Sequence, residues 1–290
     1  MTSKTNKKIK IGLCGFGKMG KRHYETYKKF DNVVVDAIYD PCIPGRDNFS
    51  SFLSKAEGLD GVSVCSPSDH HIGNALSILS VNKHIKLLIE KPISSDLFDL
   101  KVLEPFKNNI LVGHIERFNP VVNRLKSLIA NQKPTILNIK TKRLGFFVCE
   151  KGSVAEDLLV HDADIISYIL GKKPTSSHLF SNRNKFAFLV SEFDNTVSMS
   201  EASWVHPQKE RVLEITTHNG LYSANFETQK LSFYDASGFE YDLTSDEFTW
   251  PLDIELAHFL DMIKKNAQPK CSVHEAYEAI KIVLEPKRKI

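Results

Sequence analysis

The fold of the first part of the chain is decided by the stretch Ile9-Lys10-Ile11-Gly12-Leu13-Cys14-Gly15-Phe16-Gly17-Lys18-Met19-Gly20. Its apolar half predicts a short buried strand, and the G-x-G-x-x-G spacing that follows predicts a tight turn into a helix beginning near Lys18. Gly15 permits the turn, Gly17 leaves room for a pyrophosphate beside the backbone, and Gly20 lets the helix pack close to the strand. The free N–H groups and positive dipole end of that helix would face the phosphates of a dinucleotide.

The G-x-G-x-x-G spacing also fits an ordinary glycine-rich turn between a strand and a helix, but the neighbouring sequence favours a dinucleotide-binding turn. A second apolar strand, residues 33–39, ends in Asp40, twenty residues after Gly20. A carboxylate at this place accepts hydrogen bonds from the adenosine ribose of NAD and would repel the extra phosphate of NADP. Arg46 leaves NADP as an alternative cofactor. Asp40 could instead be a turn residue, because Asp is common before proline for local reasons. We therefore expect NAD, bound by Gly15, Phe16, Gly17, Lys18, Met19, Gly20 and Asp40.

A lysine follows another predicted strand at the place where a bound dinucleotide would lie. The apolar run 85–89 ends in Glu90, Lys91 and Pro92. Ligands of an open parallel sheet bind just beyond the carboxyl ends of its strands, and a proline fixes the backbone as it leaves the sheet. We therefore expect Lys91 to face the dinucleotide. The alternative is a surface lysine that caps the end of a strand.

Strands and helices alternate through the first part of the chain, which predicts an α/β domain with a doubly wound parallel sheet. The expected strands span residues 9–14, 33–39, 61–65, 85–89 and 110–113, and the expected helices begin near residue 18 or span 71–81 and 96–106. The pattern changes around Phe118-Asn119-Pro120. We therefore place a first domain in residues 1–118 and a second in residues 119–290.

The second domain is rich in predicted antiparallel strands, which span residues 136–144, 185–193, 196–203, 210–217, 221–226 and 231–234. Asn219-Gly220 is a strong hairpin signal between two of them. Helices are expected at residues 153–170, ended by Gly171, and at 254–265 and 273–284. This pattern predicts an α+β domain with a large, mostly antiparallel open sheet. Because one face of such a sheet needs a cover, we expect a homodimer or homotetramer formed through it.

Composition excludes several classes of function. A net charge of +3 over 290 residues is too small to indicate a nucleic-acid partner, and the basic clusters lie at the termini, where solvated tails are expected. The five cysteines are dispersed without a C-x-x-C pair, which is typical of reduced thiols in a cytosol. The polar N-terminus and the absence of a long apolar stretch predict no membrane association, so we expect a cytoplasmic protein.

A second chemical signal lies in the predicted helix 153–170. Asp157 and His161 are four residues apart and Asp164 follows three residues later, so a helix would place them on one face. A carboxylate beside an imidazole sets its tautomer and raises its basicity, which prepares a general base. A surface Asp-His pair is the alternative. A metal is a third possibility, but there is no partnering His or Cys cluster, so no metal is expected.

Four segments together resemble the glucose-fructose oxidoreductase, inositol dehydrogenase and MocA family: the glycine turn, the Glu90-Lys91-Pro92 tripeptide, and residues 113–118 and 157–162. The resemblance spans nearly the whole chain. It implies a Rossmann domain that binds NAD or NADP, followed by an α/β domain whose open, mostly antiparallel sheet holds a sugar and forms the dimer. It also implies that Lys91 and His161 are the catalytic pair.

The resemblance assigns supporting roles to other residues. Asp157 would be the supporting acid of His161. The segment Ser66, Pro67 and His71 is similar to the family's segment beside the cofactor, with Ser in place of Thr. Together with Glu90, Lys91 and Pro92, these three residues are therefore expected at the cofactor.

Within the family, the G-H-I-E-R-F-N-P sequence at residues 113–120 resembles UDP-N-acetylglucosamine 3-dehydrogenases. Arg143-Leu144-Gly145 and Trp204-x-x-Pro207-x-Lys209 support the same resemblance, whereas residues 146–153 lack the Pro- and Arg-rich character of the family. The resemblance implies substrate-binding roles for His114, Glu116, Arg117, Arg143, Asp157, His161, Trp204 and Lys209. Alternatively, His114 and Glu116 are polar residues of an interdomain hinge. The three basic residues either meet the diphosphate of a nucleotide sugar or are solvated charges.

The reaction implied is oxidation of a secondary alcohol of a small-molecule substrate. His161 would take the proton of the sugar 3-hydroxyl as a hydride passes to NAD, and the Lys91 ammonium would stabilise the negative charge on that oxygen. The product would be a 3-keto sugar nucleotide. Two alternatives remain: a dehydrogenase of a free cyclitol or monosaccharide, and a noncatalytic NAD-sensing protein on the same fold.

Overall fold

The computed structural model describes residues 8–146, 152–245, 247–286 and 288–289. The chain divides into two compact units. The first unit contains Met1–Gly113 and Leu252–Ala276, and the second contains His114–Pro251 and Tyr277–Ile290. The single boundary predicted between residues 118 and 119 therefore misses the return of residues 252–276 to the first unit.

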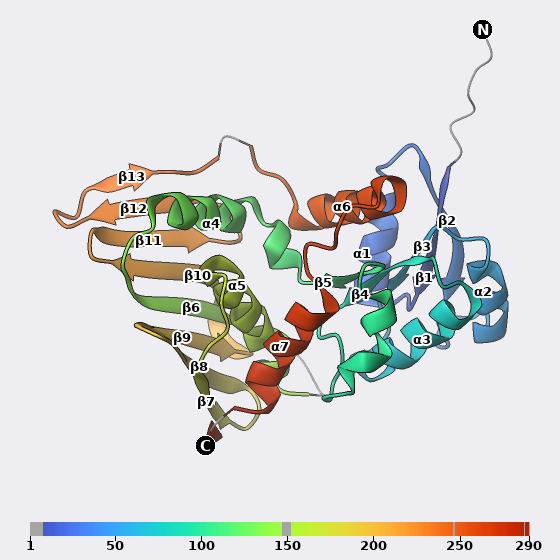
Figure 1. Cartoon of the computed structure of the whole chain (residues 1–290), viewed down its shortest axis with the longest axis horizontal. Coiled ribbons are helices and arrows are strands. Elements are labelled where there is room, and N and C mark those ends of the chain that lie inside the picture. Colours follow the sequence, from blue (N-terminus) through green and yellow to red (C-terminus); the bar gives the residue numbers. More distant parts are fainter. Residues whose placement is uncertain (1–7, 147–151, 246, 287, 290) are drawn as a thin grey trace, which may run out of the picture. The chain divides into compact units, whose positions relative to one another are not determined.

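The first unit is built on a five-stranded parallel sheet in the order β2-β1-β3-β4-β5 (Figure 1). Its strands are β1 (Ile9–Cys14), β2 (Val33–Tyr39), β3 (Gly61–Val64), β4 (Lys86–Glu90) and β5 (Ile110–Gly113). Its helices are α1 (Lys18–Tyr27), α2 (Phe49–Ala56), α3 (His71–Val81) and α6 (Pro251–Lys265), and α7 (Val273–Leu284) follows in the chain. The predicted doubly wound sheet is confirmed, and the order of its strands reverses between β1 and β3, where such folds bind ligands.

Close packing against a glycine explains why α6 belongs to the first unit. A Cβ atom on Gly61 of β3 would lie 2.7 Å from the Ile263 side chain and 2.9 Å from the ring of Phe259. Both side chains come from α6, and Phe259 is fully buried. The Lys29 ammonium also lies 2.7 Å from a carboxylate oxygen of Asp253. These contacts join residues more than 190 positions apart, so periodicity in the sequence does not reveal them.

The helix predicted at residues 96–106 is wrong. The structure has two short 3-10 turns instead, Leu100–Val102 and Glu104–Phe106. Pro105 lies in the first turn of the second of these. Proline has no backbone N–H and disfavours helical geometry in the residue before it, so a continuous helix cannot run through this segment. Helix α2 was not predicted either, although Asn48 caps it by accepting a hydrogen bond from the backbone of Ser51.

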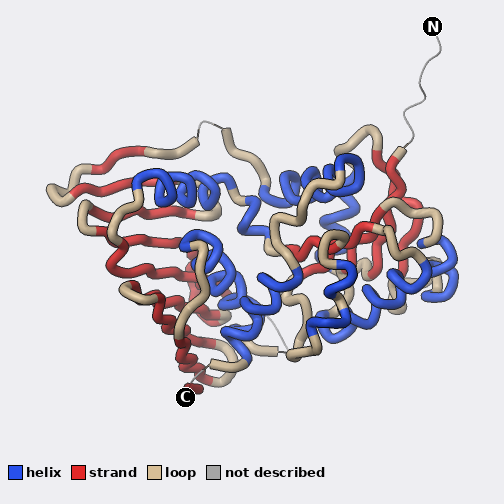
Figure 2. The backbone as a smooth tube through the Cα atoms, in the orientation of Figure 1, coloured by secondary structure: helices blue, strands red, loops and turns tan. Residues whose placement is uncertain are grey.

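The second unit is built on a nine-stranded sheet in the order β13-β12-β11-β10-β6-β9-β8-β7-β14, drawn in red in Figure 2. Its strands are β6 (Ile136–Phe146), β7 (Ser176–Asn182), β8 (Phe186–Phe193), β9 (Thr196–Ser203), β10 (Val205–Thr217), β11 (Gly220–Asn225), β12 (Leu231–Asp235), β13 (Glu240–Asp242) and β14 (Arg288–Lys289). The pairs β6 with β9 and β14 with β7 are parallel, and the others are antiparallel. The predicted large, mostly antiparallel sheet is therefore confirmed.

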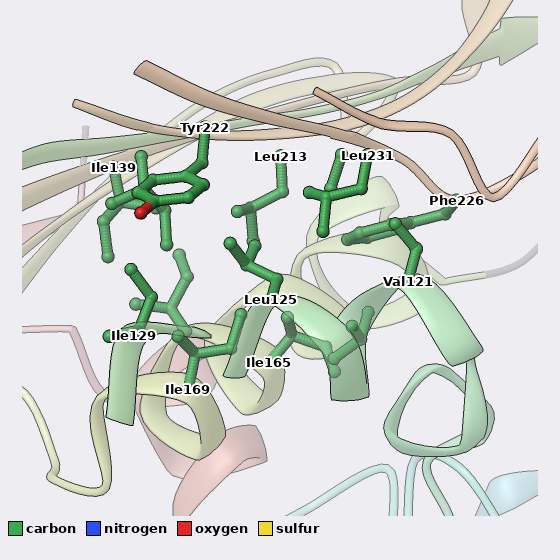
Figure 3. Close-up of a cluster of buried hydrophobic side chains, with 14 of the residues drawn as sticks. Val121, Leu125, Ile129, Ile139, Ile165, Ile169, Leu213, Tyr222, Phe226 and Leu231 are labelled. Atoms are coloured by element: carbon green, nitrogen blue, oxygen red, sulfur yellow. The ribbon is translucent and has the colours of Figure 1, made fainter. Parts of the chain in front are cut away.

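Two helices, α4 (Pro120–Gln132) and α5 (Val160–Leu170), cover one face of this sheet (Figure 3). Their apolar side chains meet those of the central strands in one buried cluster, whose labelled members are Val121, Leu125, Ile129, Ile139, Ile165, Ile169, Leu213, Tyr222, Phe226 and Leu231. Full burial of one such aliphatic side chain contributes about 1.5–3 kcal/mol. This core fixes α5, which carries the candidate base, against the sheet.

Helix α4 was not predicted, although its start carries two recognisable signals. Asn119 accepts a hydrogen bond from the backbone of Val121 at 3.3 Å, as an N-cap does, and Pro120 occupies the first position of the helix. On the opposite face of the sheet, β9 presents the exposed apolar side chains of Val197 and Met199, which pair with Asn138 and Lys140 and not with the core residue Ile139. Assembly of two or more copies through this face stays a prediction. Among the described residues, none of the helices has the length and apolar character needed to cross a membrane.

Candidate active site

The glycine turn between β1 and α1 has the shape of a phosphate cradle. Gly15 has a φ of +100°, and a Cβ atom there would lie 2.5 Å from the backbone nitrogen of Ser66. A Cβ on Gly20 would lie 2.1 Å from the carbonyl oxygen of Gly15, so the helix can start only with glycine at this position. A Cβ on Gly17 would meet nothing within 4 Å. Two glycines therefore permit the turn, and the third leaves open space at the N-terminus of a helix, which fits a pyrophosphate.

Asp40 directly follows β2 and is hydrogen-bonded to this turn. Its Oδ2 accepts a hydrogen bond from the backbone nitrogen of Phe16 at 2.7 Å, and its Oδ1 accepts one from that of Cys42 at 2.9 Å. Each carboxylate oxygen has a second lone pair, so the half-buried group can still accept from ribose hydroxyls. The guanidinium of Arg46 lies 4.7 Å from the centre of the Phe16 ring, which places a cation beside the same turn.

His71 joins the loops that follow β3 and β4. Its Nε2 lies 2.7 Å from the carbonyl oxygen of Ser66, and its Nδ1 lies 2.9 Å from that of Pro92. Burial lowers the pKa of His71, although the two carbonyl groups oppose this shift. The side chain of Asn74 also donates to the hydroxyl of Ser66 at 3.0 Å. The structure thus brings together the segments that follow β3 and β4, both of which the sequence predicts at the cofactor. His71 holds them together by its contacts with Ser66 and Pro92.

Glu90 and Lys91 are neighbours at the end of β4 but differ in burial. Glu90 is buried, and its Oε1 lies 2.9 Å from His23 Nε2. Burial would raise the pKa of Glu90, but the hydrogen bond and charge of His23 lower it overall. Lys91 is half-buried and follows directly after β4, and the Lys91–Pro92 peptide is cis. Since the glycine turn follows β1 of the same parallel sheet, Lys91 and the turn lie at the same edge of that sheet. A contact of Glu90 with the cofactor stays a prediction.

In the second unit, the helix that carries His161 begins with an unusual turn. Residues Ala155–Leu159 form a π-helical turn that continues into α5, which ends at Gly171 with a φ of +66°. Single π-helical turns inside helices occur frequently at functional sites. Asp157 lies in this turn, and its Oδ2 accepts a hydrogen bond from the indole nitrogen of Trp204 at 3.2 Å. The structure therefore joins two predicted substrate residues, while the support of His161 by Asp157 stays a prediction.

His161 is 8% exposed and has a second imidazole beside it. The rings of His114 and His161 are 6.2 Å apart and nearly perpendicular. Nδ1 of His114 lies 3.4 Å from Oδ2 of Asp164. Arg117 binds the same carboxylate, with its Nε at 2.9 Å and its Nη2 at 2.6 Å, and its guanidinium lies 4.7 Å from the centre of the Tyr168 ring. Arg117 therefore compensates the buried carboxylate of Asp164, which would otherwise be costly to hold in the interior.

A second buried arginine follows the same principle. Arg143 donates from Nε to Asp162 at 2.8 Å and from Nη1 to Glu116 at 2.9 Å. Burial would lower the pKa of Arg143, but the two carboxylates raise it overall, and burial raises the pKa of Asp162 despite the arginine. With exposed fractions of 2% and 3%, Arg117 and Arg143 are not solvated charges, so that alternative is wrong for both. Lys209 differs from them, because it is exposed and paired with Glu227.

The sequence did not point to Asp162 or Arg211 as partners of this network. The polar and apolar residues around each of them indicate only a helix or a strand. The fold brings both close to Arg143. The family departure noted at residues 146–153 falls largely on residues 147–151, which lie outside the described residues.

Comparisons with known proteins agree with this arrangement. Residues 9–105 match the family model GFO_IDH_MocA, described as an oxidoreductase family with an NAD-binding Rossmann fold. The chain is 25% identical over 191 residues to myo-inositol 2-dehydrogenase of Thermotoga maritima. That alignment covers 57% of the chain and 56% of the relative, so it spans little more than half of the relative's length.

Solved structures extend the likeness to both units. UDP-N-acetylglucosamine 3-dehydrogenase from Acidithiobacillus ferrooxidans has a TM-score of 0.84 and 19% identity, with 96% of each chain covered. Apo scyllo-inositol dehydrogenase from Lactobacillus casei has a TM-score of 0.78 and 21% identity, covering 98% of this chain and 96% of that one. At these identities the likeness shows the fold. Residues 9–105 thus match the NAD-binding Rossmann domain of that oxidoreductase family, and both units share the fold of these solved structures.

Proposed function

We propose that the protein is an NAD-dependent dehydrogenase that oxidises a secondary hydroxyl of a sugar nucleotide. The substrate we propose is UDP-N-acetylglucosamine or a related UDP-sugar, oxidised at its 3-hydroxyl to a 3-keto sugar. The observation that carries the proposal is His161, an imidazole buried in the second unit next to His114, in a chain whose first unit has an NAD-binding turn.

Each proposed catalytic residue has one task. NAD, bound at the glycine turn, supplies the acceptor for the hydride that leaves the carbinol carbon. His161 takes the hydroxyl proton as a general base, a task for which imidazole is the commonest side chain. The Lys91 ammonium stabilises the negative charge that develops on the oxygen. Asp157 positions His161. The alcohol thus loses one hydride and one proton and becomes a ketone.

A free cyclitol is the second candidate substrate, and the inositol dehydrogenases among the relatives favour it. Such an enzyme would use the same three residues, Lys91, Asp157 and His161. It would not need cations or aromatic surfaces for a nucleotide. The arrangement around Glu116 and Arg211 supports the nucleotide instead, as argued below.

The test is turnover of purified protein with NAD and a panel of substrates. UDP-hexoses, free monosaccharides and inositols are compared by the rate of NADH formation, and the product is identified by mass spectrometry and NMR. We expect NADH with UDP-sugars and a ketone at carbon 3. Turnover with inositols alone would support the second candidate, and no turnover with any substrate would indicate a noncatalytic protein.

Two variants make this test specific. Lys91→Met and His161→Asn should each remove turnover while NAD binding stays within a few-fold of the unmodified protein. Lys107→Met is the matched control for Lys91, since Lys107 is an exposed lysine of the same unit, paired with Glu104. It should leave both turnover and NAD binding unchanged.

A further inference from the structure

We propose that a cavity within the second unit binds the nucleoside diphosphate part of the substrate, an inference that rests on the proposed function. The cavity has a volume of about 360 Å³. This is near the lower end of the range for small-molecule sites, about 300–1,000 Å³, so it suits a nucleoside-sized group and not an entire sugar nucleotide. Its wall includes Lys209, Arg211, Phe226, Gln229, Phe248 and Trp250.

Two aromatic rings at the cavity form a platform for a flat base. Trp250 is 63% exposed and Phe248 is 50% exposed, and their rings lie 4.9 Å apart in a perpendicular arrangement. The side chain of Gln229 holds the segment between them. Its Nε2 donates to the carbonyl oxygen of Thr249 at 2.7 Å, and its Oε1 accepts from the nitrogen of the same residue at 3.3 Å. The rings are therefore both accessible and anchored, as a stacking surface requires.

Two cations also line the cavity. Lys209 and Arg211 are two residues apart on β10. The Nη1 of Arg211 donates to the carbonyl oxygens of Leu144 and Glu210, which fixes the orientation of its guanidinium. Burial and the nearby charge of Arg143 lower the pKa of Arg211. An anion in the cavity would relieve this repulsion, and a guanidinium can bind two phosphate oxygens at once.

The carboxylates of the cavity are already neutralised. Glu116 accepts a hydrogen bond from Arg143 at 2.9 Å, and Glu227 is paired with Lys209. A diphosphate would therefore not meet an uncompensated negative charge. Glu227 could in addition accept a hydrogen bond from a ribose hydroxyl, because a carboxylate accepts several hydrogen bonds. A free cyclitol has neither a flat ring nor a charge, and would leave these groups unused.

The cavity is connected to the candidate base through two consecutive ion pairs and one peptide bond within the second unit. Glu116 lines the cavity and binds Arg143, Arg143 binds Asp162, and Asp162 directly follows His161 in α5. One network of charged side chains therefore joins the cavity wall to the helix that carries His161.

The first test uses UDP as the probe, with the protein saturated with NAD so that the dinucleotide site is occupied. The chain has two tryptophans, and Trp204 is 3% exposed, so UDP should quench chiefly the emission of Trp250. In Trp250→Phe this quenching should largely disappear. In Trp250→Ala the Kd for UDP, measured by calorimetry, should rise about 5- to 150-fold, which corresponds to about 1–3 kcal/mol for stacking of one base.

Matched controls separate the cavity from general surface effects. Phe239→Ala removes an aromatic ring that is 60% exposed and lies outside the cavity, and Lys230→Met removes an exposed lysine paired with Glu240, as Lys209 is paired with Glu227. Neither control should change the Kd for UDP, whereas Lys209→Met should raise it several-fold. Circular dichroism of every variant verifies folding, and Trp250→Phe retains a ring if the alanine variant is unstable.

Kinetics distinguish failure of the cavity from failure of the proposed function. Trp250→Ala should raise KM for the UDP-sugar and change kcat little, because the base is bound equally in the ground and transition states. If UDP-sugars are oxidised but neither Trp250→Ala nor Lys209→Met affects KM or the Kd for UDP, the subsite is refuted and the proposed function stands. If the protein oxidises inositols and binds no UDP, the nucleotide substrate is refuted as well.

Discussion

Alanine substitutions in the glycine turn should distinguish the glycine that the fold requires from the glycine that NAD binding requires. Gly17 has φ and ψ of −70° and −155°, which any residue adopts, and a Cβ atom there meets nothing within 4 Å. A Cβ on Gly20 would lie 2.1 Å from the carbonyl oxygen of Gly15, which is backbone and cannot turn aside. Gly17→Ala should therefore leave the fold intact and block the pyrophosphate, whereas Gly20→Ala should disrupt the turn itself.

The expected magnitudes follow from these contacts. In Gly17→Ala, a poorer helix cap costs about 0.5–1 kcal/mol, and the less flexible unfolded chain offsets this by about 0.4–1 kcal/mol, so stability should change by less than about 1 kcal/mol. In Gly20→Ala, overpacking typically costs about 1–3 kcal/mol, and a clash with backbone belongs at the upper end or beyond. The Kd for NAD should rise at least about tenfold in Gly17→Ala, or about 1.4 kcal/mol.

Urea unfolding and calorimetric titration with NAD measure the two effects independently. The reasoning predicts that Gly17→Ala unfolds at nearly the same urea concentration as the unmodified protein and binds NAD poorly. Gly20→Ala should unfold at a clearly lower concentration. NAD binding by Gly17→Ala at the original affinity would refute the position assigned to the phosphates, and an unchanged stability of Gly20→Ala would refute the close approach of turn and helix.

Three further predictions concern the first unit. Asp40→Asn should weaken NAD several-fold and NADP less, because the carboxylate no longer repels the extra phosphate; equal weakening in titrations with both would show that it does not contact the ribose. His23→Leu should lower the free energy of unfolding by about 3–5 kcal/mol near neutral pH by leaving Glu90 buried without its partner. Since His23 lowers the folded-state pKa of Glu90, this stabilisation is present above the unfolded carboxyl pKa and is lost as the pH falls through the folded value. Urea unfolding should thus show a smaller difference near pH 4, and an equal difference at both pH values would contradict the assignment. Burial raises the pKa of Cys14 to about 12, so iodoacetamide should modify the exposed Cys42 well before Cys14. Bound NAD should slow the modification of Cys42. Peptide mapping that finds Cys14 modified first would argue against the burial of Cys14.

Elements with strong local patterns could be predicted from the sequence. Residues 33–39, 71–81, 110–113 and 273–284 have the predicted type and bounds, because apolar periodicity and flanking turn residues specify them locally. The glycine turn was predicted for the same reason, since its spacing is itself the physical requirement of the fold. The turn between β1 and α1 could thus be placed without a structure.

Features that depend on distant residues could not be predicted. The sequence predicts Arg117 to be a substrate cation or a solvated charge, yet it binds Asp164, 47 residues away, in the interior. The segment with Phe248 and Trp250 carries no periodic pattern, and only the cavity beside Arg211 gives it a possible role. Tertiary contacts decide both cases, and no local signal in a single sequence reports them.

We propose that Lys91 and His161 act on the same substrate hydroxyl, and a double-mutant cycle decides whether this claim is correct. The measurement is kcat/KM for NADH formation from a UDP-sugar by the unmodified protein, Lys91→Met, His161→Asn and the double variant, at saturating NAD. Each single substitution should reduce the rate about 100- to 10,000-fold, and the double variant should be little slower than the slower single one, because groups that act as a unit are not additive. Losses that multiply, or a near-normal rate in either single variant with NAD bound, would contradict the claim.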